Sequence, residues 1–260
     1  MRLADKTIVI TGAGSGIGAA LANRFAAESP RGLILADLNL EAVTEVAEQV
    51  GGVPFEADVS SSEANAELIG LAENRFGPVD LFCANAGYGA VGDEQSPTED
   101  WDRMWHVNFM SHVHAARHLI PGWVERGDGY LLVTASAAGL LTNLRAAQYS
   151  VTKHAAVAFA EWLAVTYGDA GVKVSCLCPQ FVNTALVEGA DEFELLAQLA
   201  PLLEPEEVAE SVVAGLDAEE FLILPHPEVA QYFKNKANDY DRWIGGMRKL
   251  QRNLFPPSAE

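Results

Sequence analysis

The chain has 260 residues, of which 49% are hydrophobic and 20% charged, a composition typical of globular proteins with a sizeable core. Its formal net charge of −19 argues against nucleic acids and anionic membranes as partners, because both bind to basic patches. The charge also disfavours strongly anionic substrates, since the sequence shows no local basic cluster.

Short apolar runs alternate with longer helical stretches along the chain. The runs predict strands at 6–11, 32–37, 79–85, 130–136, 172–178 and 220–224. Their near-continuous hydrophobicity is typical of parallel strands that are covered on both faces. The alternation predicts an α/β fold, a doubly wound parallel sheet of about seven strands with helices on both faces. No repeat or linker interrupts it, so 1–260 is predicted to be a single domain.

Three helical stretches carry specific expectations. Ser60 and Glu63 predict a capping box at the start of one helix. The stretches 101–124 and 148–167 are each long enough for a continuous crossover helix.

A glycine-rich loop, TGAGSGIG at 11–18, joins the first predicted strand to the first helix. Its glycines lack the Cβ atoms that would keep a pyrophosphate away from the backbone, and the helix N-terminus supplies free N–H donors. The strand before it and the helix after it are the context that this motif requires. We therefore predict a dinucleotide-binding Rossmann fold, with the loop residues Gly12, Gly14, Ser15, Gly16, Ile17 and Gly18 at the site.

Asp37 ends the second predicted strand, 19 positions after Gly18. A carboxylate there can accept hydrogen bonds from the adenosine ribose hydroxyls and would repel a 2′-phosphate. Neither Ala36 nor Leu38 offers a cation for such a phosphate, and Arg31 precedes the strand. The prediction is therefore NAD rather than NADP, with a role for Asp37 as a turn or cap residue left open.

Tyr149 and Lys153 lie four positions apart in AAQYSVTKHAA, which places them on the same face of a predicted helix. The preceding strand ends at Ser136. In an open parallel sheet the ligand crevice lies at the carboxyl ends of the strands. Ser136 and the start of the Tyr149 helix are therefore predicted to face the same crevice.

These features together resemble the short-chain dehydrogenase/reductase family over nearly the full length. The matching pieces, in order, are TGAGSGIG, Asp58 in ADVS, NAG at 85–87, Asn108 in HVN, Ser136, the Tyr149–Lys153 pair and CPQFVNT at 178–184. The phrases CPQFVNTAL and ADLNLEA are also similar to the NAD-dependent 15-hydroxyprostaglandin dehydrogenase branch, a similarity that does not identify a substrate.

The resemblance implies an NAD-dependent enzyme that interconverts a secondary alcohol and a ketone by hydride transfer. It makes Tyr149 the general acid/base, Ser136 the donor to the substrate oxygen and Lys153 a contact of the nicotinamide ribose. Asn108 would hold a water that links Lys153 to solvent. The resemblance also extends the cofactor site to Asp37, Asp58, Val59, Asn85, Ala86, Gly87, Tyr149, Lys153, Pro179, Val182 and Thr184.

The acid/base role requires a shifted pKa. A phenol titrates near pH 10, and moving it to 7 takes roughly 4 kcal/mol of preference for the phenolate. A unit positive charge at about 4 Å supplies that much at an effective dielectric near 20. Lys153, aided by the charge of the oxidised nicotinamide, is therefore expected to lower the pKa of Tyr149, although desolvation acts in the opposite direction.

Three segments depart from the family pattern or extend it. Gln180 stands where the family usually has glycine, and its amide either simply fits or faces the nicotinamide or the substrate oxygen. Segment 185–205 lies where the family places a substrate lid, and its apolar residues indicate an apolar substrate unless they pack on the body of the fold. The extension 225–260 is predicted to hold an aromatic-rich helix that covers either a neighbouring subunit or its own chain.

Several further expectations concern metals, thiols and assembly. His112, His114 and His118 crowd one helix without a clear third ligand, so no metal is predicted. The three cysteines, Cys83, Cys176 and Cys178, are expected to be buried reduced thiols. Without a signal peptide or an apolar run of about 18 residues, the chain is predicted to be cytoplasmic. The resemblance implies a homodimer or homotetramer.

Two other functions stay open. An NADPH-dependent ketoreductase is the first, and Asp37 opposes it. A non-catalytic NAD-binding sensor or scaffold is the second, and it has no need of Tyr149.

Overall fold

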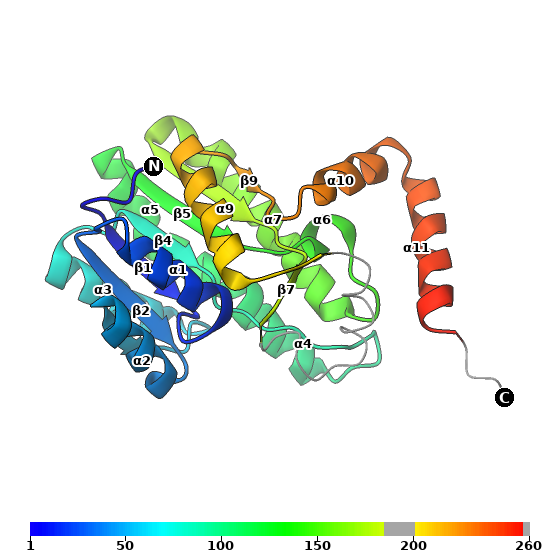
Figure 1. The fold of residues 1–260 in the computed structure, drawn as a ribbon, viewed down its shortest axis with the longest axis horizontal. Helices are drawn as coiled ribbons and strands as arrows, with labels where there is room; N and C mark the ends of the chain where they lie inside the picture. Colours follow the sequence, from blue (N-terminus) through cyan, green and yellow to red (C-terminus); the bar gives the residue numbers. More distant parts are fainter. Residues whose placement is uncertain (185–200, 257–260) are drawn as a thin grey trace.

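The computed structural model describes residues 1–184 and 201–256. A seven-stranded parallel sheet crosses the body in the order β3-β2-β1-β4-β5-β6-β9 (Figure 1). Its strands are β1 (Thr7–Thr11), β2 (Gly32–Asp37), β3 (Val53–Glu56), β4 (Leu81–Ala84), β5 (Gly129–Thr134), β6 (Val172–Leu177) and β9 (Leu222–Ile223). The order reverses between β1 and β4, which is where doubly wound sheets open a crevice at the carboxyl ends of their strands. The predicted fold class is confirmed.

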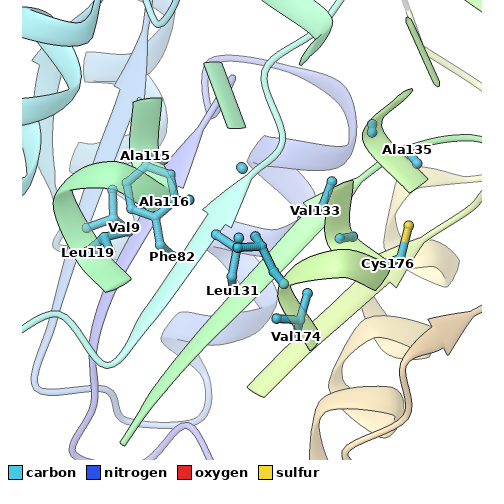
Figure 2. Close-up of a cluster of buried hydrophobic side chains, with 14 of the residues drawn as sticks. Val9, Phe82, Ala115, Ala116, Leu119, Leu131, Val133, Ala135, Val174 and Cys176 are labelled. Atoms are coloured by element: carbon cyan, nitrogen blue, oxygen red, sulfur yellow. The ribbon is translucent and has the colours of Figure 1, made fainter. Parts of the chain in front are cut away.

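Helices cover both faces of the sheet because neighbouring strand residues point to opposite sides. Ile8 and Ile10 of β1 pack in one buried cluster with side chains of α1 (Gly16–Ala26), α2 (Leu40–Val50) and α9 (Pro205–Ala218). Val9 between them belongs to a second cluster, with side chains of α3 (Ser62–Phe76), α5 (Ser111–Arg126) and α7 (Ala147–Tyr167). Figure 2 shows part of this second cluster, where Phe82 lies among Val9 and the α5 residues. The two clusters pack both faces of the sheet, which therefore forms a rigid support for the loops at the carboxyl ends of its strands.

The sheet contains one strand that the sequence pattern did not mark. β3 reads VPFE, which contains a proline and a glutamate rather than an apolar run. It lies at the edge of the sheet, where proline is tolerated and one side stays partly exposed. All six strands predicted from the sequence form, although β4 and β9 are shorter than expected.

The capping box predicted from Ser60 and Glu63 is wrong. The N-cap of α3 is Ser61, whose hydroxyl accepts a hydrogen bond from the N–H of Ala64 at 3.2 Å. The Ser60 hydroxyl instead donates to Asp58 at 2.6 Å. Because the Ser60 hydroxyl is bonded to Asp58, the next residue, Ser61, caps the helix instead.

The stretch predicted as one helix at 101–124 is interrupted. It comprises α4 (Thr98–Trp105), a π-helical segment η1 (His106–Met110) and then α5. Such π segments are rare and often lie at functional sites. Asn108 lies in this segment and is fully buried.

The C-terminal extension forms two helices rather than one, α10 (Glu228–Asn238) and α11 (Tyr240–Leu254). Asp239 between them has extended backbone angles, and its side chain accepts the N–H of Arg242 at 2.9 Å, capping α11. Val229 of α10 is buried in the second cluster, and Tyr232 and Trp243 pack against that cluster. The far end of α11 projects away from the body (red in Figure 1).

The remaining elements are short. They are α6 (Ala138–Leu141), η2 (Gly168–Ala170), and the paired strands β7 (Phe181–Val182) and β8 (Leu202–Leu203). Most of the predicted lid, 185–200, lies outside the described residues. In the part of the chain that is described, no helix combines the length and apolarity needed to cross a bilayer.

Candidate functional site

A cavity of about 660 Å³ lies at the carboxyl ends of the strands. Loops that follow β1, β2, β4, β5 and β6 contribute to its wall. Most residues predicted from the sequence line it: Gly12, Ser15, Gly16, Ile17, Asp37, Asp58, Val59, Asn85, Ala86, Gly87, Ser136, Tyr149, Lys153, Pro179, Val182 and Thr184. The described lining does not include Gly14, Gly18 or Asn108.

The glycine-rich loop presents bare backbone to this cavity. Gly12 has φ +65°, and a Cβ there would lie 2.8 Å from the Cα of Ala86, so only glycine fits without displacing the neighbouring loop. The N-cap of α1, Ser15, makes no side-chain capping bond. The N–H groups of the first helical turn are therefore available to an anionic ligand. This loop fits a dinucleotide pyrophosphate.

Asp37 is held at the end of β2 by backbone donors. Its Oδ2 accepts the N–H of Gly14 at 2.9 Å and its Oδ1 accepts the N–H of Asn39 at 3.0 Å. Arg31 lies elsewhere, donating to the carbonyl of Asp5 at 2.7 Å. The carboxylate therefore meets no cation from Arg31 and remains free to accept further hydrogen bonds from the cavity.

Ser136, Tyr149 and Lys153 converge at the inner end of the cavity. Tyr149 is 9% exposed and Lys153, one turn later on α7, is 3% exposed. The Lys153 Nζ lies 5.7 Å from the Tyr149 ring centroid and donates to the carbonyl of Thr134 at 2.9 Å. The Ser136 hydroxyl donates to the carbonyl of Pro179 at 3.4 Å and accepts the N–H of Ala138 at 3.0 Å. The arrangement places a hydroxyl, a phenol and an ammonium around one pocket.

Burial determines the ionisation of this cluster. It raises the pKa of Tyr149 above its ordinary value, and the influence of Ser136 only partly opposes this. Burial also lowers the pKa of Lys153 to about 8, opposed by Cys176 and Cys178. In the protein alone, desolvation of the phenolate dominates. The expectation that Lys153 and the oxidised nicotinamide together lower the pKa of Tyr149 stays a prediction. Lys153 nonetheless remains largely protonated at neutral pH.

Asn108 lies behind the cavity wall, where it holds the loop after β4. Its Oδ1 accepts the N–H of Tyr88 at 3.0 Å, and its Nδ2 donates to the carbonyl of Tyr88 at 2.8 Å. A Cβ on Gly87 would lie 3.1 Å from this Oδ1 and 3.3 Å from the Lys153 Nζ. Asn108 and Lys153 are thus neighbours across Gly87, while the water-holding role of Asn108 stays a prediction.

Asn85 connects two of the loops that form the wall. Its Nδ2 donates to the carbonyl of Thr11 at 3.1 Å, and its Oδ1 accepts the hydroxyl of Thr134 at 3.0 Å. Its side chain therefore joins the ends of β1 and β5, which is a structural task that the sequence motif did not reveal.

Several lining residues were not predicted. They include Leu38, Ala57, Tyr88, Val91, Arg103, Val107 and Thr134. Thr134 could have been inferred, because it lies two residues before Ser136 on the same strand end. Arg103 and Val107 come from α4 and η1, and no local pattern marks them. Arg103 also places a cation on the wall, although no basic cluster is visible in the sequence.

The predicted histidine and cysteine features are placed as follows. His118 Nε2 lies 3.2 Å from the Ser62 hydroxyl. His112 is buried, and neither of its ring nitrogens has a hydrogen-bond partner among the described residues. Cys83, Cys176 and Cys178 are buried free thiols, as predicted.

Comparison with known proteins agrees with this geometry. Residues 6–195 match the family model described as short chain dehydrogenase. The chain is 31% identical to 1-deoxy-11-beta-hydroxypentalenate dehydrogenase of Streptomyces exfoliatus, over 100% of this chain and 94% of that protein. It is 32% identical to meso-2,3-butanediol dehydrogenase of Serratia marcescens, over 85% and 90% of the two chains. Among solved structures, a short chain dehydrogenase/reductase from Burkholderia phymatum in complex with NAD superposes with a TM-score of 0.84 at 28% identity, over 100% of both chains.

Proposed function

Since the chain belongs to the short-chain dehydrogenase family, we propose that it is an NAD-dependent oxidoreductase that interconverts a secondary alcohol and a ketone. The observation that carries the proposal is one cavity whose wall contains both the glycine loop with Asp37 and the cluster of Ser136, Tyr149 and Lys153. A protein that only binds a dinucleotide needs the glycine loop and Asp37 but not the cluster of Ser136, Tyr149 and Lys153. The names of two relatives, a hydroxypentalenate dehydrogenase and a butanediol dehydrogenase, support a hydroxyl-bearing substrate.

Residues of the cavity have the chemistry to hold the cofactor. The first turn of α1 would bind the pyrophosphate, and Asp37 the adenosine ribose. Lys153 would donate to the nicotinamide ribose, and Thr184, which lies beside Gly16, would contact the carboxamide. When bound, NAD supplies the hydride acceptor and, in its oxidised form, a positive charge near the reacting carbon.

The chain's own residues would handle the proton. Tyr149 accepts the proton of the alcohol in oxidation and returns it to the ketone oxygen in reduction. Ser136 donates a hydrogen bond to that oxygen, which stabilises the charge that develops on it. Because burial raises the pKa of Tyr149 in the protein alone, the ammonium of Lys153 must act with a second positive charge to favour the phenolate.

The preference for NAD rests on Asp37. Among the described residues that line the cavity, the cations are Arg103, on α4, and Lys153, in the catalytic cluster. A 2′-phosphate beside Asp37 would be repelled by its carboxylate. We therefore propose NAD and not NADP as the working cofactor.

The test is a screen of secondary alcohols and ketones with NAD and NADP side by side, followed at the nicotinamide absorbance. We expect turnover with NAD, and we expect Asp37→Ser to shift the ratio of kcat/KM values toward NADP. A higher kcat/KM with NADP in the wild type would indicate a ketoreductase. Tight NAD binding without turnover of any compound would instead favour a sensor.

We also propose that the protein is a cytoplasmic homodimer or homotetramer. An aromatic row runs over α4, η1 and α7, with ring centroids 4.5 Å apart for Trp105–Phe109, 6.0 Å for Phe109–Phe159 and 6.5 Å for Phe159–Trp162. Trp162 is 54% exposed. Exposed aromatic surface of this kind supports a protein–protein contact. The buried free thiols are compatible with a reducing compartment.

A further inference from the structure

A second cavity, of about 670 Å³, lies between the body of the domain and the C-terminal extension. The body contributes the segment Leu141–Leu144, which begins at the last residue of α6, together with Gln180 and Phe181. The extension contributes Tyr232, Asn235, Asn238, Asp239, Arg242, Trp243, Gly246, Met247 and Leu250. This volume falls within the range of about 300–1,000 Å³ that is usual for small-molecule sites.

The extension is fixed to the body at both ends of this cavity. Lys236 of α10 is buried, and its Nζ donates to the carbonyl of Leu140 at 2.7 Å. Beyond α11, the Phe255 ring lies 5.1 Å from the guanidinium carbon of Arg145. The two helices therefore form one wall of the cavity, opposite the Leu141–Leu144 segment.

Gln180 lines both this cavity and the cavity that contains Tyr149. The two cavities thus share one lining residue. The Oε1 of Gln180 is buried and has no hydrogen-bond partner among the described residues. Buried polar atoms are nearly always paired in folded proteins, so this oxygen points to a ligand group that comes past it.

The backbone around Gln180 is held in place by a buried histidine. The Gln180 N–H donates to Nδ1 of His226 at 3.1 Å. Since Nδ1 accepts, the ring proton is on Nε2, which lies 3.1 Å from the carbonyls of both Phe181 and Pro201. His226 therefore positions Gln180 between the cavities.

We infer that the substrate extends from Tyr149 past Gln180 into the second cavity, and is a secondary alcohol or ketone that carries a large, mostly apolar group. This inference rests on the proposed function, because it takes Tyr149 as the reacting end. The side chains of Leu141, Phe181, Trp243 and Met247 would bury that group, and the C-terminal extension is then part of the substrate site.

Two neighbouring glycines of α11 provide a matched test. Gly246 lines the second cavity and Gly245 does not, and a Cβ at either position would meet no atom within 4 Å. Gly246→Trp should fill the cavity, while Gly245→Trp adds the same side chain to the same helix outside it. Neither change touches the catalytic cluster.

Kinetics with 2-alkanols from 2-butanol to 2-nonanol and NAD measure the effect. In the wild type we expect kcat/KM to rise about fourfold with each methylene that enters the cavity. Gly246→Trp should lower kcat/KM for 2-nonanol at least tenfold and leave 2-butanol unchanged, with Gly245→Trp behaving like the wild type. A flat dependence on chain length, or equal losses with both alcohols, would overturn the inference.

A binding readout separates this inference from the proposed function. We expect 2-nonanol to raise the thermal unfolding midpoint of the wild type and of Gly245→Trp, but not of Gly246→Trp. Turnover of 2-butanol without this pattern would refute the second-cavity site alone. The pattern without turnover of any alcohol would keep the site and refute the proposed dehydrogenase activity.

Discussion

Burial favours the neutral forms of Tyr149 and Lys153. It raises the pKa of the phenol and lowers the pKa of the ammonium to about 8. Lys153 keeps its ammonium charge at neutral pH, whereas the phenol of Tyr149 is neutral and ionises more easily when a further positive charge comes near. The carbonyl of Thr134 holds the Lys153 ammonium in place, accepting its hydrogen bond at 2.9 Å. Acid–base function in this cluster depends on what enters the cavity.

The residue-scale test of the acid/base role is Tyr149→Phe. We expect kcat to fall by about 10²–10⁴-fold, because a positioned general acid/base typically contributes that much. NAD affinity, measured by calorimetry, should change little. Tyr130→Phe is the control, since its hydroxyl bonds Ser175 in the core at 2.8 Å. Near-normal turnover in Tyr149→Phe would contradict the assignment.

His112 makes a separate prediction about pH and stability. Burial lowers its pKa from 6.5 to about 3, so in the pH range between these values the unfolded chain binds a proton that the folded chain does not. The free energy of unfolding should therefore fall as the pH drops from 6.5 toward 3. His112→Leu should remove this contribution.

Urea unfolding of the wild type and His112→Leu at several pH values measures this contribution of His112 to stability. The stability of His112→Leu relative to the wild type should increase steadily as the pH is lowered below 6.5. A difference that stays constant from pH 7 to pH 4.5 would mean that the imidazole can be protonated in the folded protein.

At the scale of elements, the junction of β1 and α1 depends on close backbone contact. A Cβ on Gly18 would lie 1.9 Å from the carbonyl oxygen of Gly12 and 2.9 Å from Nδ2 of Asn85. The helix could accept this atom only by moving away from the strand. Such a shift would displace the N–H groups that face the cavity.

Gly18→Ala should therefore destabilise the protein by about 1–3 kcal/mol, as overpacking usually does. Gly70→Ala, in α3, is the matched control, because nothing lies within 4 Å of its added Cβ. That change should stabilise the helix by about 0.5–1 kcal/mol. Denaturant unfolding compares the two, and NAD affinity should fall only in Gly18→Ala. Equal effects at both positions would argue against the tight junction.

At the scale of the whole molecule, the buried surface lies on both faces of the sheet and the aromatic row lies outside it. Trp162 and Val165 are exposed on α7, at 54% and 80%. This surface is the part of the described molecule that best suits a second subunit, as the proposed oligomer requires.

Trp162→Glu should lower the molar mass measured by light scattering after gel filtration, because it places a charge in the proposed interface. Leu40→Glu is the control, since Leu40 is also exposed but lies at the start of α2. Mass that is unchanged in Trp162→Glu would place the subunit contact elsewhere.

Much of this molecule follows from local sequence patterns. The apolar runs and the glycine loop predict the parallel sheet and the first crossover, because strand burial and phosphate approach impose strict residue types. The spacing of Tyr149 and Lys153 likewise places both on one helical face. The shift of the cap from Ser60 to Ser61 is likewise local, since the two residues are neighbours in the chain. The strand β3 is an exception, because its place at the sheet edge, which lets it form without an apolar run, is set by the fold.

Only the tertiary structure decided the properties that depend on groups distant in the chain. The pKa values of Tyr149 and Lys153 follow from burial by several elements, which no spacing reveals. Arg103, Gln180 and the C-terminal helices line cavities because the fold brings separate segments together. Patterns of neighbours along the chain specify elements, whereas desolvation and cavity shape are sums over contacts that form only when the whole chain is packed.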